Sequence, residues 1–309
     1  MPSDVSRDTS VDAIVIGGSY AGLAASLQLA RARRRVLVID AGEPRNRFAK
    51  ASHGFLGQDG RSPSTITEDA RAQLLAYPTV IWRDGRASGA EGSIDAFSVS
   101  TTDGEHYEGR RLVIATGVVD HLPEIPGLRQ RWGKTVVHCP YCHGYEFAGG
   151  PLGVLATSPL ALHQALLVPD WGRTTLFLNG SFTPDDEQKA MLRRRDVTIV
   201  PGAVAAISGD DDVTVQLGDG RTTTVAGLFV ASRTAPASPL AAQLGCAFTE
   251  GMLGPLVTTD EIKATSVPGV FACGDAALAM TSVSLAVADG AMAGVAAHRS
   301  LVMAAAGHV

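Results

Sequence analysis

The sequence predicts an α/β fold built from two nucleotide-binding-type domains. Two strand–turn–helix–strand patterns carry this prediction, one near the N-terminus and one over residues 151–180. A third observation is the C-terminal stretch 267–300, which has the pattern of a strand, a turn and a long helix of small residues. Buried strands joined by crossover helices are typical of parallel sheets, and 309 residues are enough for two such domains.

The first pattern begins with a run of apolar residues, Ala13 to Ile16, that predicts a buried strand. The glycine turn "GGSYAG" follows. A helix is then expected, because small and apolar residues recur at helical spacing at Ala21, Leu23, Ala24, Leu27 and Ala30. A second buried strand, residues 36–39, ends at Asp40 and completes a βαβ unit.

This turn is a candidate dinucleotide site. Gly17 and Gly22 occupy the first and third positions of a Gly-x-Gly-x-x-Gly fingerprint, and Ser19 stands at the second. A tight turn before a helix points backbone N–H groups at a pyrophosphate, and Asp40 stands where a carboxylate can accept hydrogen bonds from a ribose. A tight turn that binds no ligand remains the alternative.

The two domains are expected to join at two crossings. The stretch "RRLVIATGVVDHLPEIPG" is a strand ending near Gly117 and a proline-rich crossing, and a second crossing is expected near residues 231–240. In the C-terminal "GVFACGDAA", Gly274 and Asp275 directly follow a buried strand. Asp275 could hold a cofactor hydroxyl or could cap the next helix, and the pattern leaves both open.

Composition excludes several classes of protein. Hydrophobic residues make up 45% of the chain and charged residues 18%, which is too apolar for disorder, and the net charge of −5 gives no reason to expect nucleic-acid binding or membrane-surface binding. No apolar run reaches transmembrane length, and the polar "MPSDVSRDTS" shows no signal peptide. We therefore expect a cytoplasmic protein, in which a close cysteine pair is more often catalytic or metal-binding than structural.

The chemistry concentrates in "VVHCPYCHGYEF", where Cys139 and Cys142 flank two residues and His143 follows. Zinc needs four ligands, usually from two separated pairs, and the chain has one Cys-x-x-Cys. A structural disulfide would close too small a loop to add much stability. A redox dithiol is favoured, with His143 as the local acid and base. His53 could line a site, but a loop histidine is slightly favoured, and Cys246 and Cys273 are interpreted as buried small hydrophobes.

Four motifs stand in one order: "VIGGSYAG", "ATG" (residues 115–117), "CPYC" and "GVFACGD". Together they resemble the low-molecular-weight thioredoxin reductase family. The resemblance implies two Rossmann-like domains, an FAD-binding domain split between residues 1–120 and 241–309 and a central NAD(P)-type domain, residues 121–240, that carries the redox disulfide. By that resemblance Cys142 faces the flavin, Cys139 exchanges with substrate, and FAD is held by Gly17, Gly18, Ser19, Ala21, Gly22, Asp40, Ala115, Thr116, Gly117, Gly274, Asp275 and Val283.

The chain departs from ordinary thioredoxin reductases after the second cysteine. Those enzymes have an Asp as acid and base there, whereas this chain has His143. "CPYCHGYE" resembles the branch of dithiol oxidases that close disulfides in natural products such as gliotoxin, holomycin and romidepsin. That resemblance implies a carboxylate partner for His143, and Asp289 on the C-terminal helix is the candidate.

A second departure concerns the nicotinamide cofactor. The turn that should read Gly-x-Gly-x-x-Ala is "ATSPLA", residues 156–161, so both glycines are absent. Where NADPH-using relatives have an arginine-rich segment, this chain has Asn179 and then Asp185 and Asp186, which would repel a 2′-phosphate. We therefore expect the protein not to depend on NADPH.

The expected function is an FAD-dependent dithiol oxidase. It would form a disulfide within a small-molecule dithiol and use O₂ as electron acceptor, giving H₂O₂. The alternatives are a thioredoxin-disulfide reductase driven by NADPH or another donor such as ferredoxin, and a non-catalytic nucleotide- or zinc-binding regulator. The resemblance also implies a homodimer, and we expect neither nucleic-acid nor membrane partners.

Overall fold

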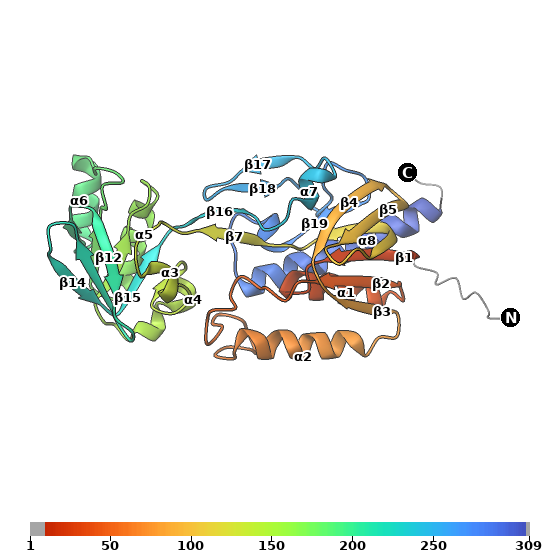
Figure 1. The fold of residues 1–309 in the computed structure, drawn as a ribbon, viewed down its shortest axis with the longest axis horizontal. Helices are drawn as coiled ribbons and strands as arrows, with labels where there is room; N and C mark the ends of the chain where they lie inside the picture. The colour runs from red at the N-terminus through yellow and green to blue at the C-terminus, as the bar shows by residue number, and fades with distance from the viewer. Residues whose placement is uncertain (1–9, 307–309) are drawn as a thin grey trace. The chain divides into compact units, whose positions relative to one another are not determined.

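The computed structural model describes residues 10–306 (Figure 1), so the N-terminal segment examined for a signal peptide lies outside the described residues. The chain forms two compact units. The first takes the described residues of Met1–Arg45, Ser64–Val119 and Ala235–Val309, and the second takes Asn46–Pro63 and Asp120–Thr234. Residues 46–63 therefore group with the second unit, although the sequence analysis places them within the first domain.

The first unit is built on a seven-stranded sheet of order β3-β2-β1-β6-β5-β4, in which β19 also pairs with β6. Five strands are mutually parallel: β1 (Ser10–Ile16), β2 (Val36–Asp40), β3 (Val80–Asp84), β6 (His106–Ile114) and β19 (Val270–Ala272). The other two, β4 (Ala87–Ser93) and β5 (Ala96–Thr101), form an antiparallel extension on β6. Its helices are α1 (Tyr20–Arg31), α2 (Pro63–Leu75), α7 (Leu240–Gln243) and α8 (Val283–Ala305).

Both faces of this sheet are buried, as the unbroken apolar strands predict. Ala13 and Val15 of β1 face one core, which α1 and α8 cover, whereas Ile14 and Ile16 face a second core closed by α7, β4 and β5. Helices α1 and α8 pack backbone against backbone. A Cβ atom on Gly290 of α8 would lie 2.0 Å from the carbonyl oxygen of Ala21, so only glycine permits this approach.

A fully buried arginine fastens α8 to the sheet. Arg111 of β6 is 0% exposed. Its Nε donates to Ser300 Oγ at 2.6 Å, its Nη2 donates to the carbonyl of Ser300 at 3.0 Å, and its Nη1 pairs with Asp95 at 2.8 Å. Partial burial would raise the pKa of Asp95, but the hydrogen bonds and charges of Arg111 and Arg110 outweigh this effect and lower it. Arg111 is therefore satisfied on every side.

The second unit has a smaller sheet, in which three consecutive strands are again followed by a later one and the first strand of the unit forms the edge. Its all-parallel sheet has the order β11-β10-β9-β15-β8, with the strands β8 (Val136–Val137), β9 (Leu152–Leu155), β10 (Thr174–Phe177), β11 (Thr198–Val200) and β15 (Gly227–Val230). One face packs against an antiparallel layer of β12 (Val204–Ser208), β13 (Val213–Leu217) and β14 (Thr222–Val225). The other packs against α5 (Ala161–Leu167) and α6 (Asp186–Arg194).

The remaining elements connect or decorate the units. The chain leaves the first unit in β7 (Val118–His121) and returns in β16 (Arg233–Pro236), and these two strands pair. The short helices α3 (Leu128–Arg131) and α4 (Pro140–His143) belong to the second unit, and the β17 (Phe248–Glu250)–β18 (Pro255–Val257) hairpin to the first. The predicted α/β class with two parallel, doubly covered sheets is confirmed.

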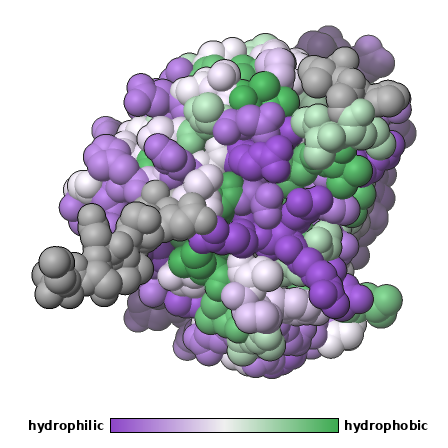
Figure 2. Space-filling model, turned by 90° about the vertical axis from the view of Figure 1, so that its right-hand side faces the viewer, coloured by the Kyte–Doolittle hydropathy of each residue, from purple (hydrophilic) through white to green (hydrophobic). Residues whose placement is uncertain are grey.

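Within residues 10–306, no helix combines the length and the apolar character that crossing a bilayer requires. Figure 2 shows one face of the molecule, on which polar side chains are interspersed with smaller apolar groups.

Candidate functional site

The cysteine pair lies where the second unit's sheet turns into a short helix. Cys139 follows β8 and is the N-cap of α4, and Cys142 lies within that helix. The two sulfur atoms are thiols 2.7 Å apart. A small movement would bring them to the disulfide bond length of about 2.05 Å, so the local backbone allows the pair to open and close.

His143 ends α4 directly behind Cys142, and both of its ring nitrogens are buried. Neither nitrogen has a hydrogen-bond partner of ordinary geometry among the described residues. Burial disfavours the imidazolium and lowers the pKa of His143, against the opposing influence of the Cys139 backbone and the Glu146 carboxylate. The ring is therefore neutral near pH 7, which is the form that can accept a proton from a thiol.

Two residues outside the predicted catalytic set influence His143. Glu146, in the 3₁₀ turn η1 (Tyr145–Phe147), and His53, from the segment 46–63, both act electrostatically on His143. His53 Nε2 lies 3.4 Å from Glu146 Oε1, so this histidine has a partner in the redox segment and is more than a loop residue. No local sequence signal links His53 to Glu146.

Packing fixes the rest of the motif. Tyr141 meets the edge of Trp171 with ring centroids 5.2 Å apart, and a Cβ atom on Gly144 would lie 2.6 Å from Trp171. His138 Nδ1 lies 3.3 Å from the carbonyl oxygen of Val230. His138 therefore faces strand β15, and its contact is a backbone carbonyl.

The other two cysteines have no redox neighbour among the described residues. Both are buried, as predicted. Burial, with a further contribution from Asp289, raises the pKa of Cys273 far above its ordinary value. Burial also raises the pKa of Cys246, and the hydrogen bond to Thr265 offsets this only in part. Both side chains therefore remain inert thiols at neutral pH.

In the first unit the predicted cofactor turn is tight. Gly17 has φ = 103°, and a Cβ atom there would lie 2.3 Å from the carbonyl oxygen of Ala115. A Cβ atom on Gly22 would lie 1.7 Å from the carbonyl oxygen of Gly17. Only glycine fits at both positions, and the turn leads into the N-terminus of α1, as a pyrophosphate site requires.

Asp40 at the end of β2 is tied into this turn. Its Oδ1 accepts a hydrogen bond from the N–H of Gly18 at 2.9 Å. Trp82 of β3 packs over the same glycine, since a Cβ atom on Gly18 would lie 2.4 Å from the indole. Ser19 is the N-cap of α1, but its side chain makes no capping hydrogen bond. The first N–H groups of α1 are thus not occupied by the Ser19 hydroxyl.

The C-terminal turn comes to the same edge of the sheet. The N–H of Cys273 donates to Ile114 at 3.0 Å and the N–H of Ala115 donates to Ile16 at 2.8 Å, so the carboxyl ends of β1, β6 and β19 lie together. Asp275 pairs with Arg45, whose Nη1 lies 2.9 Å from Asp275 Oδ2.

Asp289 lies in α8, 4% exposed. Its Oδ2 accepts from the N–H of Gly274 at 2.9 Å and its Oδ1 pairs with Lys263 at 2.6 Å. Both oxygens are thus engaged within the first unit, whereas His143 belongs to the second. The predicted pairing of Asp289 with His143 stays a prediction.

These residues fit an FAD molecule. The glycine turn, Asp40, the "ATG" strand end and the Gly274–Asp275 turn gather at the carboxyl edge of one parallel sheet, which is where dinucleotides bind in such folds. A Cβ atom on Gly117 would have no neighbour within 4 Å. Helix α8 begins at Val283, shortly after the Gly274–Asp275 turn in the sequence, with Ser282 as its N-cap. The predicted cofactor residues thus lie in one unit, and the predicted cysteines and His143 lie in the other.

In the second unit, the turn after β9 (residues 156–161) corresponds to the glycine turn of the first unit. Hydrogen bonds within the second unit hold this turn. Ala156 is fully buried, and Thr157 Oγ1 donates to the carbonyl of Ala231 at 2.9 Å. Asn179 donates to the carbonyl of Ala156 at 3.4 Å and accepts from the N–H of Val204 at 2.8 Å. Asp185 caps α6 by accepting from the N–H of Gln188 at 2.8 Å.

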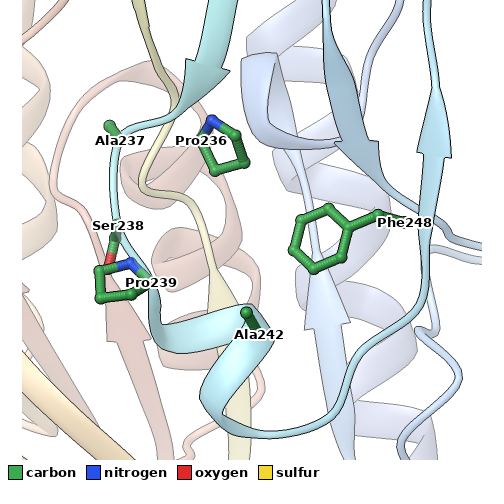
Figure 3. Close-up of a pocket in the computed structure, with 6 residues that line it drawn as sticks. All are labelled: Pro236, Ala237, Ser238, Pro239, Ala242 and Phe248. Carbon is green, nitrogen blue, oxygen red and sulfur yellow. The ribbon is translucent and has the colours of Figure 1, made fainter.

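A cavity of about 370 Å³ in the first unit borders the "ATG" motif, because the N–H of its lining residue Ala237 donates to the carbonyl of Gly117 at 3.1 Å. Figure 3 shows its lining, in which Ser238 alone has a polar side chain: Pro236, Ala237, Ser238, Pro239, Ala242 and Phe248. None of the predicted site residues contributes to it. The functional site is therefore defined by the two motif clusters and not by this cavity.

Comparison with known proteins gives consistent matches over the whole chain. The family described as pyridine nucleotide-disulphide oxidoreductase matches residues 11–290. Thioredoxin reductase tcpT of Claviceps purpurea (strain 20.1) is 33% identical over 94% of each chain, and thioredoxin reductase sirT of Leptosphaeria maculans is 33% identical over 92% of each. An oxidoreductase structure from Agrobacterium tumefaciens has a TM-score of 0.93 and 51% identity, covering 95% of this chain and 99% of that one. The crystal structure of HlmI has a TM-score of 0.90 and 38% identity, covering 97% and 95%.

Proposed function

Because this chain belongs to the pyridine nucleotide-disulphide oxidoreductase family, as a thioredoxin reductase-like member with FAD as its cofactor, we propose that it is an FAD-dependent dithiol oxidase. Its family makes it a flavin-type redox enzyme that acts on sulfur groups. In the proposed role it closes a disulfide within a small-molecule dithiol, in the cytoplasm, with O₂ as the electron acceptor.

The observation that carries the proposal is His143. A half-buried imidazole whose pKa is lowered by burial stands directly after Cys142, and it is neutral at the pH at which a thiol must be deprotonated. A base in this state can take the proton that a dithiol must lose before its sulfur can attack a disulfide.

The residues would act in two exchanges. His143 takes the proton from one substrate thiol, and the resulting thiolate attacks Cys139 Sγ of the oxidised pair. The Cys139–Cys142 bond breaks, leaving a substrate–Cys139 mixed disulfide and a Cys142 thiolate. The second substrate thiol attacks the substrate sulfur of that mixed disulfide and passes its proton to the departing Cys139 sulfur. The substrate disulfide closes, Cys139 leaves as a thiol, and the enzyme pair has gained two electrons.

When bound, FAD would supply an acceptor for the two electrons of the Cys139–Cys142 dithiol and would transfer them to O₂, giving H₂O₂. The residues that would hold it are the glycine turn (Gly17, Gly22), Asp40 and the Gly274–Asp275 turn.

The closed turn of the second unit supports a route without NADPH. Ala156 is buried in the core, and the side-chain amide of Asn179 is hydrogen-bonded to the Ala156 carbonyl and the Val204 N–H. A phosphate clamp at this point would need arginine side chains, and the sequence has Asn179 and two aspartates in that region.

A thioredoxin reductase is the second candidate, because tcpT and sirT carry that name. One spectroscopic titration separates the two functions. Mixed anaerobically with dithiothreitol, the purified holoenzyme should lose its flavin absorbance and regain it in air with release of H₂O₂, while NADPH should leave the absorbance unchanged. Rapid reduction by NADPH, with none by the dithiol, would establish the reductase instead.

We also propose that the active form is a homodimer. Exposed apolar side chains recur along one face of α8, at 37–48% exposure: Leu285, Met292, Val295 and Val302. Apolar side chains that recur along an exposed helix face are typical of protein–protein interfaces, and the exposed Arg299 lies among them. Light scattering on the purified protein in solution should give a molar mass twice that of the 32.1 kDa chain.

A further inference from the structure

The redox segment has a charged partner that its sequence does not reveal. Glu146 follows His143 by three residues, and Gly144 between them has helical backbone angles (φ −65°, ψ −36°), so the two residues are i,i+3 neighbours on one helical surface. The Glu146 side chain is 38% exposed. His53 Nε2 lies 3.4 Å from Glu146 Oε1, and His53 Nδ1 lies 3.6 Å from Asp59 Oδ1. His53 thus stands between two carboxylates, one on the redox segment and one on its own loop.

The loop that brings His53 to this place is closed on itself. The N–H of Ser52 donates to the carbonyl of Arg61 at 2.8 Å, and the N–H of Gly60 donates to the carbonyl of Ser52 at 2.9 Å. The N–H of Gly54 donates to Asp59 Oδ1 at 2.8 Å. Such a compact loop holds its side chains in place by its own hydrogen bonds, so His53 is presented to Glu146 by a defined structure.

The loop is also packed on the second unit. A Cβ atom on Gly133 would lie 2.6 Å from the Cβ of Phe48, so this glycine allows the loop to approach. Residues 46–63 group with the second unit and not with the sequence that flanks them. The loop therefore belongs to the body that carries the cysteines.

His143 is open to control by such neighbours. Its buried ring nitrogens have no hydrogen-bond partner of ordinary geometry among residues 10–306, so no contacting carboxylate fixes its charge. The groups that act on it are burial, the Cys139 backbone, the Glu146 carboxylate and His53. Glu146 favours the imidazolium and His53 opposes it.

We propose that Glu146 and His53 form a positioning pair that sets the charge state of His143, with Glu146 favouring proton uptake and His53 moderating it. This inference rests on the proposed role of His143 in thiol–disulfide exchange, but it does not depend on the direction of electron flow. Neither residue needs to touch the substrate, because each acts through His143.

The test measures the protonation of His143 directly. In the FAD-loaded enzyme carrying ¹³C-labelled histidine, the ring signal of His143, assigned with the His143→Asn variant, is followed against pH. Glu146→Gln should move the midpoint to lower pH, because the carboxylate that favours the imidazolium is gone. His53→Gln should move it to higher pH, because Glu146 then acts unopposed. Glu146→Asp, which keeps the charge, should lie between Glu146→Gln and the wild type.

Two exposed residues of the same unit serve as matched controls. Glu187→Gln and His163→Gln make the same chemical changes away from the redox segment and should leave the midpoint unchanged. Opposite shifts in the two test variants support the proposal, whereas shifts of the same sign, or none, overturn it. If Glu146→Gln fails to fold, the upward shift in His53→Gln decides alone.

The same preparations separate this proposal from the function. The acid limb of anaerobic flavin bleaching by dithiothreitol should move with the His143 midpoint in each variant. If the dithiol fails to bleach the flavin while the His143 midpoint still shifts as expected, the dithiol oxidase is refuted and the positioning pair is not.

Discussion

Replacing Asp289 by Asn decides between two roles for this buried carboxylate. Asp289 is 4% exposed and joins Lys263, whose side chain is 15% exposed, to the Gly274 turn that is expected to bind FAD. Asparagine can still accept a hydrogen bond from the Gly274 N–H, but it leaves the ammonium of Lys263 without a compensating negative charge. Removing one partner of a buried ion pair costs about 3–5 kcal/mol. Because Lys263 is close to solvent and can relax, we expect Asp289→Asn to destabilise the fold by the lower end of that range.

A loss of about 3 kcal/mol corresponds to a fall of about 6–12 °C in melting temperature for a domain of 150–250 residues. The assay follows flavin release and circular dichroism of the holoenzyme on heating. Lys263→Met should destabilise at least as much, because it leaves the buried Asp289 carboxylate without its cation. The double variant Lys263→Met/Asp289→Asn should cost less than the sum of the two, with a coupling of about 0.5–3 kcal/mol.

The outcome has a clear alternative. Cys139 and Cys142 belong to the other unit, so Asp289→Asn should leave their titration with a thiol reagent unchanged. If Asp289→Asn keeps its melting temperature and its flavin but moves the acid limb of dithiol oxidation, Asp289 acts on His143 as the family resemblance implies. The assignment to the cofactor turn is then wrong.

Three further outcomes are expected. Gly22→Ala should yield protein without FAD, seen as lost flavin absorbance, because the new Cβ would lie 1.7 Å from the Gly17 carbonyl oxygen; Ser19→Gly should retain FAD. Arg111→Met should lower the free energy of unfolding in urea by about 3 kcal/mol, since it removes the partner of the Ser300 hydroxyl and of the Asp95 carboxylate. The partly exposed control Arg110→Met should cost less than about 1 kcal/mol. His143→Asn should slow dithiol oxidation about 10²-fold. In the wild type, oxidation should persist at mildly acidic pH and fall only as the pH drops through the lowered pKa of His143; a fall at the ordinary histidine pKa would contradict the burial argument.

The elements that the sequence predicts well are those set by local pattern. The strand Ala13–Ile16, the turn with Gly17 and Gly22, the helix after it and Asp40 at the next strand end all follow from apolar runs, helical spacing and glycine placement. These features depend on residues within a few positions of one another. The same is true of α8, where small residues and Ser282 at the start mark a helix that must approach its neighbour closely.

The features that the sequence does not predict depend on residues far apart in the chain. His53 reaches Glu146 only because residues 46–63 pack on the second unit, and Lys263 reaches Asp289 only because both flank the Gly274 turn. A charged side chain has no periodic pattern that identifies its partner. Spacing and composition therefore suggested a loop histidine at 53 and gave no role to Lys263 or Arg45.

The acidic residues at the start of α6 are a weaker argument against NADPH binding than the sequence suggests. Asp185 is the N-cap of α6 and shares a capping box with Gln188, so helix capping alone is a sufficient reason for an acid at that position. The arginines that could bind a phosphate are at the other end of that helix. Arg193 and Arg194 are in its last turn, roughly 13 Å from its start by the rise of an α-helix, and Arg195 Nη2 donates to Asp170 at 2.6 Å.

The case for electrons entering from a dithiol therefore rests less on the aspartates than on Ala156 and Asn179. Ala156 is fully buried at the first glycine position of the fingerprint, which serves the tight turn, and Asn179 joins the Ala156 carbonyl to the Val204 N–H through its own amide. Both are engaged in the fold itself. These contacts are the reason for proposing that electrons enter from a dithiol through the Cys139–Cys142 pair, with His143 accepting the proton.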